Sequence, residues 1–186
     1  MTDHAWLLIG SLNVQSVKPK LLELSQELHR FSYDVMALQE TWLKPSTPSR
    51  LLSLPGYRVY RTDRPDGRGY GGVALAIRTG TDATQLKVPE RRRPGSALET
   101  VLSLLKLDRE RQLIVASVYR PPNHTAAALT SDFADLEAQY QRVLIDHPNN
   151  DIVICGDLNC DLRKPETDAG RRHISQFMSD FDLHRS

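Results

Sequence analysis

Three apolar runs of this 186-residue chain each end in a polar side chain that a protein core would not select. The first run ends at Asn13, the second at Glu40, and the third at Asp157 with Asn159 two residues later. A single Asn or Asp in such a place is most often a turn residue. Because three runs share the feature, we expect them to bring carboxylate and amide oxygens together, which are the ligands that Mg²⁺ prefers. Phosphoryl transfer uses such a metal.

Basic and phenolic groups accompany these polar ends. Tyr119 and Arg120 follow a fourth apolar run, and both side chains are able to bind a phosphate, although a lone Tyr there is more often a half-buried aromatic. Further arginines lie in two expected loops: Arg91, Arg92 and Arg93, and Arg61, Arg64 and Arg68. We expect these loop arginines either to be solvated or, on a polynucleotide substrate, to contact backbone phosphates.

The elements that position these groups follow from hydrophobic periodicity. Strands are expected at residues 6–13, 33–40 and 152–155, the last buried on both faces and ended by Gly156. Helices are expected at residues 17–31, with Ser16 as a cap and Pro19 in the first turn, at 130–146, and at 168–181 with Asp168 as a cap. We find no repeat or linker and therefore expect a single domain over residues 1–186.

The middle of the chain has a different pattern. Residues 57–61, 72–78, 99–107 and 112–119 indicate antiparallel strands joined by short turns. The glycines at positions 67, 69, 71 and 72 do not fit a dinucleotide-binding fingerprint, because a strand rather than a helix follows them. They indicate a hairpin at which the backbone approaches another group closely.

Composition restricts the partners. The chain has 24 Lys and Arg against 23 Asp and Glu, a formal charge of +1, so no overall field favours nucleic acid or a membrane surface. No run approaches the roughly 20 apolar residues of a membrane span, and no signal peptide precedes the first strand. We expect a soluble, intracellular protein without membrane contact. Cys155 and Cys160 are expected to be buried free thiols, since two cysteines alone do not form a zinc site.

Five short motifs, taken together, resemble those of a known family. They are SLNVQS at 11–16, LQETWL at 38–43, GYGGV at 69–73, VYRPP at 118–122 and GDLN at 156–159. In this order they resemble the endonuclease/exonuclease/phosphatase (DNase I-like) superfamily, and most narrowly the apurinic-type endonuclease domain of non-LTR (LINE-like) retrotransposons. The resemblance extends over about residues 6–180.

The resemblance implies an α/β fold, a four-layer sandwich of two packed mixed β-sheets flanked by helices. It also implies hydrolysis of phosphodiesters with Mg²⁺ or Mn²⁺, DNA as the partner, a nuclear place of action and a reverse transcriptase domain in the full-length element. Glu40 would be a metal ligand, and Asn13 would help to bind the metal or the scissile phosphate. Asp157 would orient or deprotonate the attacking water, Asn159 would position that water and the phosphate, and Tyr119 would contact the phosphate.

One departure from the family pattern bears on activity. Family members continue with a strand that carries an Asp and close on a Ser-Asp-His motif, whereas this chain ends at Ser186, and Asp182-Leu-His184 is not that motif. We therefore expect a domain that is incomplete at its carboxyl terminus, exposes a sheet edge and has weak activity or none. Two alternatives stay open: a non-catalytic remnant that binds nucleic acid or protein, and another phosphoesterase of the superfamily.

Overall fold

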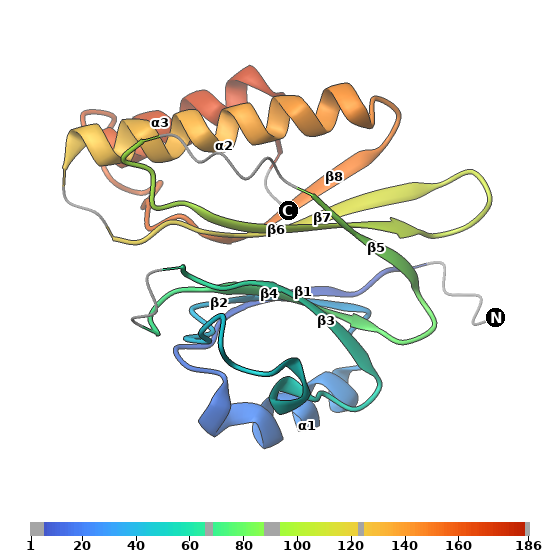
Figure 1. Ribbon diagram of the computed structural model, residues 1–186. Helices are drawn as coiled ribbons and strands as arrows, with labels where there is room; N and C mark the ends of the chain where they lie inside the picture. Colours follow the sequence, from blue (N-terminus) through green and yellow to red (C-terminus); the bar gives the residue numbers. More distant parts are fainter. Residues whose placement is uncertain (1–5, 66–68, 88–93, 123–124, 185–186) are drawn as a thin grey trace. The chain divides into compact units, whose positions relative to one another are not determined.

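The computed structural model describes residues 6–65, 69–87, 94–122 and 125–184 (Figure 1). The chain divides into two compact units. The first comprises Met1–Val88, Glu99–Tyr119 and Asn150–Gly156, and the second comprises Pro89–Leu98, Arg120–Asn149 and Asp157–Ser186. The expectation of a single domain over the whole chain remains a prediction.

The strands of the described residues form two four-stranded sheets (Figure 1). The first sheet has the order β1-β2-β4-β3, with β1 at Ile9–Asn13, β2 at Val35–Gln39, β3 at Tyr57–Thr62 and β4 at Val73–Arg78. The second has the order β5-β6-β7-β8, with β5 at Asp82–Leu86, β6 at Glu99–Lys106, β7 at Gln112–Tyr119 and β8 at Asp151–Asp157. In the first sheet β1 runs parallel to β2, and the other neighbours are antiparallel.

The second sheet is also mixed. β5, β6 and β7 are antiparallel neighbours. At one end of β8 the Asn150 amide donates to the Gln112 side chain at 3.1 Å, and at the other end the Arg120 N–H donates to the Asp157 carbonyl at 2.9 Å. Because the early residues of β7 and β8 meet and their last residues meet, the two strands run in the same direction.

Apolar side chains fill the space between the two sheets, which are both part of the first unit. The residues of this core come from alternate positions of the facing strands and include Val35, Ala37, Leu75, Ile77, Val101, Leu105 and Val115. The outer face of the first sheet is covered by α1 (Leu21–Phe31), which buries Leu24 and Leu28 against it (Figure 1). The fold class expected from the resemblance, two packed mixed sheets with helices, is thereby confirmed.

The second unit contains the two remaining α-helices of the described chain, α2 (Ala126–Asp146) and α3 (Ala169–Asp180). They pack on each other through aromatic rings: the ring centroid of Tyr140 lies 5.7 Å from that of Phe177 and 4.7 Å from that of Phe181. Such edge-to-face pairs add to the stabilisation from buried area.

The helices α2 and α3 each begin directly after a residue whose side chain caps the first turn. Asp168 accepts a hydrogen bond from the Arg171 N–H at 3.0 Å, so the expected cap of α3 is confirmed. α2 begins earlier than expected because the Thr125 hydroxyl caps the Ala128 N–H. The expectation that Ser16 caps the first helix is wrong. Ser16 has a φ of 76° and is followed by a 3₁₀ turn, η1 (Lys18–Lys20), which has no side-chain cap but does have Pro19 in its first turn.

β8 differs from its sequence expectation in two respects. Its residues 152–155 are half-buried rather than buried on both faces, because β8 is the edge strand of the second sheet in the described chain. Gly156 does not end the strand, which continues to Asp157. Glycine is required there for another reason: a Cβ at this position would lie 1.9 Å from the Val118 carbonyl oxygen of β7.

Both cysteines are free thiols, as expected, although each is only half-buried. Burial raises the pKa of the Cys155 and Cys160 thiols. No helix within the described ranges has the length and apolarity needed to cross a membrane.

Candidate active site

Side chains from the ends of β1, β2 and β7 meet at the carboxylate of Glu40, all within the first unit. The Asn13 amide donates to Glu40 Oε1 at 2.7 Å, and the Trp42 indole N–H donates to Oε2 at 3.2 Å. The Tyr119 hydroxyl donates a third hydrogen bond to the same carboxylate. The structure thus brings together three of the residues that the sequence singled out, Asn13, Glu40 and Tyr119, and adds Trp42, which the sequence analysis had not assigned a role.

The backbone around Glu40 is held from both sides. Glu40 has a φ of 55°, a left-handed conformation that side-chain-bearing residues seldom adopt and that costs about 1–3 kcal/mol. Its carbonyl accepts the Ser16 N–H at 2.9 Å, so the loop after β1 is fastened to the end of β2. On the other side, Thr41 and Trp42 donate their N–H groups to the carbonyls of Gly72 and Gly71. These bonds fix the segment in its strained conformation.

Tyr119 is held in its neutral form. Its side chain is 5% exposed, and its pKa is raised well above the ordinary value of 10.0, first by burial and then by the charges of Glu40 and Glu99 and the hydrogen bond to Glu40. The raised pKa means that the phenol keeps its proton at physiological pH. It acts there as a hydrogen-bond donor and not as a base.

The raised pKa predicts a pH-dependent stability. A phenol whose pKa is higher in the folded state stabilises the protein fully below pH 10.0, and the contribution is lost as the pH rises above that value. The difference in free energy of unfolding between the unchanged chain and Tyr119→Phe should therefore shrink from about pH 8 to about pH 11 in urea titrations. Tyr70→Phe, at a 58% exposed position, is the control. A difference that stays constant with pH would contradict the assignment.

A second carboxylate is that of Glu99, which lies directly opposite Tyr119 on the neighbouring strand in the β6–β7 register. Glu99 is 0% exposed, and Arg64 Nε donates to it at 2.6 Å. The Gly72 N–H donates to its other oxygen at 2.5 Å. A Cβ at Gly71 would lie 2.7 Å from Glu99 Oε1. The glycines therefore allow the close approach that the sequence indicated, and Glu99 is the group approached.

The glycine segment is a hairpin connection, as expected, because β3 and β4 are antiparallel and Thr62 pairs with Val73. Two arginines of its flanking segments are partly buried and each interacts with a carboxylate. Arg64 binds Glu99, and Arg61 Nη2 lies 3.4 Å from Asp63 Oδ2. Four of the arginines singled out from the sequence lie outside the described residues: Arg68, Arg91, Arg92 and Arg93.

In the second unit, Asp157 and Asn159 form a compact turn. The Asn159 N–H donates to Asp157 Oδ1 at 2.9 Å, and the Asn159 amide donates to the Arg120 carbonyl at 2.8 Å. Asn159 has a φ of 50°, which Asn tolerates better than most residues. These two bonds fix the orientation of both side chains at the end of β8.

Arg120 is a buried part of this turn. Its side chain donates to the carbonyls of Leu158 at 2.7 Å and Asn159 at 3.1 Å, and Nη1 lies 3.7 Å from Asp132 Oδ2. Asp132 is 0% exposed and accepts the Ala97 N–H at 2.7 Å. The sequence indicates Arg120 as a residue that is able to bind a phosphate of a nucleic acid. At 3% exposure, with its donors directed at two carbonyls, it instead supports the Asp157–Asn159 turn from within.

The donor chemistry around Glu40 fits a hard divalent cation. Glu40 and Asn13 supply carboxylate and amide oxygens, and neither a thiolate nor an imidazole takes part, which suits Mg²⁺ or Mn²⁺ better than zinc. An ion held by so few protein ligands keeps several water molecules, as Mg²⁺ commonly does. Within the described residues, no three His, Cys, Asp or Glu side chains form a group that could hold a metal.

Comparison with solved structures shows what the fold resembles. The endonuclease domain of TRAS1, a telomere-specific non-LTR retrotransposon, has a TM-score of 0.66 and 18% identity over 94% of this chain and 70% of that chain. D. rerio TDP2 in complex with a single-strand DNA product has a TM-score of 0.64 and 15% identity over 92% and 66%. ANGEL2, a 2′,3′-cyclic phosphatase, has a TM-score of 0.63 and 20% identity over 90% and 56%.

The chain spans 66% or less of the length of the TDP2 and ANGEL2 structures. Comparison with curated proteins gave no significant match. A family model matches residues 10–177, which include all five motifs and the residues around Glu40 and Asp157. This chain therefore belongs to the Endonuclease/Exonuclease/phosphatase family.

Proposed function

We propose that the chain hydrolyses phosphodiesters of DNA with a divalent metal, as the nicking endonuclease domain of a retrotransposon-derived protein. The observation that carries the proposal is the convergence of Asn13, Trp42 and Tyr119 on the Glu40 carboxylate at the ends of three strands. The five ordered motifs support the narrower retrotransposon origin. That origin implies a nuclear place of action and a reverse transcriptase domain in the same polyprotein.

In the proposed mechanism, Glu40 and Asn13 hold Mg²⁺ or Mn²⁺ by their side-chain oxygens. A metal held there would supply Lewis-acid polarisation of a phosphate oxygen. Tyr119 is kept protonated by its surroundings, and its hydroxyl turns its single proton from Glu40 to a nonbridging phosphate oxygen as negative charge grows there. Trp42 keeps the Glu40 carboxylate in place through its indole N–H.

Asp157 is proposed to accept the proton of the attacking water. The Asn159 N–H binds Oδ1 of Asp157 and so fixes the carboxylate plane. Asn159 is proposed to position the water and the phosphate through its side-chain amide. Its present hydrogen bond, to the Arg120 carbonyl at 2.8 Å, holds that amide in a defined orientation.

The test is nicking of supercoiled plasmid by the chain in Mg²⁺ and in EDTA. Asp157→Ala should lower the nicking rate by about 10²-fold or more, because a general base contributes about 10²–10⁴-fold. Asp151→Ala is a matched control, since Asp151 is exposed and begins the same strand. Equal nicking by the unchanged chain and Asp157→Ala, or nicking that persists in EDTA, would contradict the proposed function.

A second candidate is another phosphoesterase activity of the same family. It is favoured by the similarity of the fold to ANGEL2, a 2′,3′-cyclic phosphatase. A panel of plasmid, abasic duplex, RNA, 2′,3′-cyclic phosphate and inositol phosphate substrates separates the two. DNA binding without turnover of any of them would support the non-catalytic alternative.

A further inference from the structure

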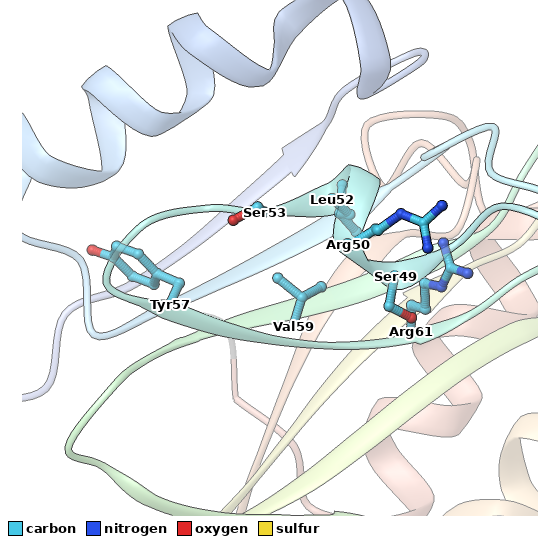
Figure 2. Close-up of a pocket in the computed structure, with 7 residues that line it drawn as sticks. All are labelled: Ser49, Arg50, Leu52, Ser53, Tyr57, Val59 and Arg61. Carbon is cyan, nitrogen blue, oxygen red and sulfur yellow. The ribbon is translucent and has the colours of Figure 1, made fainter.

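A cavity of about 220 Å³ opens beside β3 in the first unit, apart from the residues around Glu40 (Figure 2). One wall is the 3₁₀ turn η2 (Ser49–Leu52) with the residue after it, and the other is β3. Its lining residues are Ser49, Arg50, Leu52, Ser53, Tyr57, Val59 and Arg61.

The walls of this cavity are fixed by the fold. Tyr57, Val59 and Arg61 alternate along β3 and so face the same side of the sheet. The Tyr57 hydroxyl donates to the Tyr33 carbonyl at 2.7 Å, which holds the ring in place. Leu52 is 4% exposed and belongs to the apolar core on this face of the sheet. The β3 wall and Leu52 are therefore held by the fold, whereas Ser49, Arg50 and Ser53 are exposed.

One end of the cavity is cationic. Figure 2 shows the Arg50 and Arg61 guanidinium groups at the same end, with Ser49 near Arg61 and the apolar side chains of Leu52 and Val59 between this end and Tyr57. Two guanidinium groups and a hydroxyl at one end of a cavity form a set of hydrogen-bond donors suited to phosphate.

At this end of the cavity, the protein's own carbonyl and carboxylate groups do not satisfy every donor or neutralise every positive charge. Arg61 Nη2 donates to the Thr47 carbonyl at 2.5 Å and lies 3.4 Å from Asp63, so Asp63 offsets much of the Arg61 charge. Nη1 of Arg61 is buried and has no hydrogen-bond partner among the described residues. A buried donor without a partner costs about 1–3 kcal/mol. Arg50, which is exposed and belongs to η2, supplies the remaining positive charge.

The strand register gives the distance between this end of the cavity and the strand that ends at Glu40. Arg61 pairs with Ala74 of β4, and Ala74 pairs with Leu38 of β2, two residues before Glu40. Neighbouring strands lie about 4.8 Å apart, so the Arg61 backbone lies roughly 10 Å from that of Leu38, toward the same end of the sheet. Along a duplex that distance corresponds to about three nucleotide steps of 3.4 Å.

We propose that this cavity binds a backbone phosphate of the nucleic-acid strand, a few nucleotides away from the phosphodiester at Glu40. The inference rests on the proposed function, which supplies the strand. Arg50 contacts the phosphate from the open side, and Arg61 and Ser49 donate to it from within. The contact adds affinity for nucleic acid and takes no part in bond cleavage.

The experiment measures binding of a labelled DNA duplex to the metal-free chain in EDTA over a series of NaCl concentrations. Log Kobs falls with log salt concentration by a slope of about 0.9 for each phosphate contacted. Arg50→Gln should reduce the magnitude of that slope by about 0.9. Arg30→Gln is the matched control, because Arg30 is an exposed arginine of α1 that lies 3.6 Å from Glu27.

The outcomes are distinct. A reduced slope for Arg50→Gln and an unchanged slope for Arg30→Gln support the proposal, whereas equal slopes for Arg50→Gln and the unchanged chain overturn it. If inorganic phosphate raises the melting temperature of the unchanged chain but not of Arg50→Gln while the slopes stay equal, the cavity takes free phosphate and the strand assignment is overturned. Because binding is read in EDTA, failure of plasmid nicking would contradict the proposed function without changing the slope.

Discussion

Replacing Glu40 by glutamine is expected to lower the rate of Mg²⁺-dependent nicking by about 10²-fold or more. Glutamine has nearly the same volume but carries no charge, so it removes the one carboxylate of the donor group formed with Asn13, Trp42 and Tyr119. A neutral amide is a poor ligand for a hard divalent cation. Plasmid nicking at several Mg²⁺ concentrations measures the effect.

The loss should not come from unfolding. The glutamine oxygen is still able to accept one of the three hydrogen bonds, so the free energy of unfolding should fall by only about 1–3 kcal/mol. Glu23→Gln provides the matched control, since Glu23 is an exposed carboxylate in the first turn of α1. Urea titration of both variants checks that the folded state persists.

The Mg²⁺ dependence separates two roles for Glu40. If Glu40 holds the metal, higher Mg²⁺ concentrations should partly restore nicking by Glu40→Gln. A loss that does not change with Mg²⁺ would mean that Glu40 acts through Tyr119, whose hydroxyl it binds. Nicking by Glu40→Gln at the rate of the unchanged chain would remove Glu40 from the site altogether.

Much of this arrangement follows from local sequence. Apolar runs predict strands because a buried strand must be apolar at successive positions, and a polar residue at the end of a run marks where the strand leaves the core. That reasoning indicated β1, β2 and β7, and the structure brings their ends, Asn13, Glu40 and Tyr119, together. Whether these residues catalyse a reaction stays a prediction.

Other elements could not be predicted because their patterns are weak. β5 has the sequence DATQL, in which only Ala83 is buried, so it lacks the alternation of a half-buried strand. It is held by pairing with β6, its neighbour in space, over the register from Asp82–Lys106 to Leu86–Leu102. The edge position of β8 depends likewise on strand order, which a run of apolar residues does not reveal.

Buried charges were the hardest residues to predict. Glu99 and Arg64 are separated by 35 residues and meet only after β3, β4 and β6 are in place. A charged residue in an isolated sequence segment is expected at the surface, because burying it without a partner is costly. Pairing makes their burial possible, and such pairing over a long sequence distance leaves no local pattern.

Arg120 is another buried charge that the local sequence does not reveal. Its pairing with a buried carboxylate gives the second prediction with a large expected effect. Arg120 and Asp132 are 3% and 0% exposed, and Nη1 lies 3.7 Å from Oδ2. Removing one member of a buried pair leaves the other charge uncompensated and costs about 3–5 kcal/mol. Arg120→Met should therefore lower the free energy of unfolding by about that amount, as measured by urea titration.

Asp132→Asn, made alone and together with Arg120→Met, tests whether the ion pair is the cause of this loss of stability. Asparagine keeps an oxygen for the Ala97 N–H but removes the charge, so the double variant should be more stable than the sum of the two single changes predicts. Arg163→Met, which breaks the exposed pair with Asp161, should leave the stability within experimental error. Additive losses in the double variant would contradict the ion pair as the source of stability. We expect the salt slope of DNA binding to be the same for the double variant and the unchanged chain. A slope whose magnitude falls by about 0.9 in the double variant would mean that Arg120 contacts a phosphate.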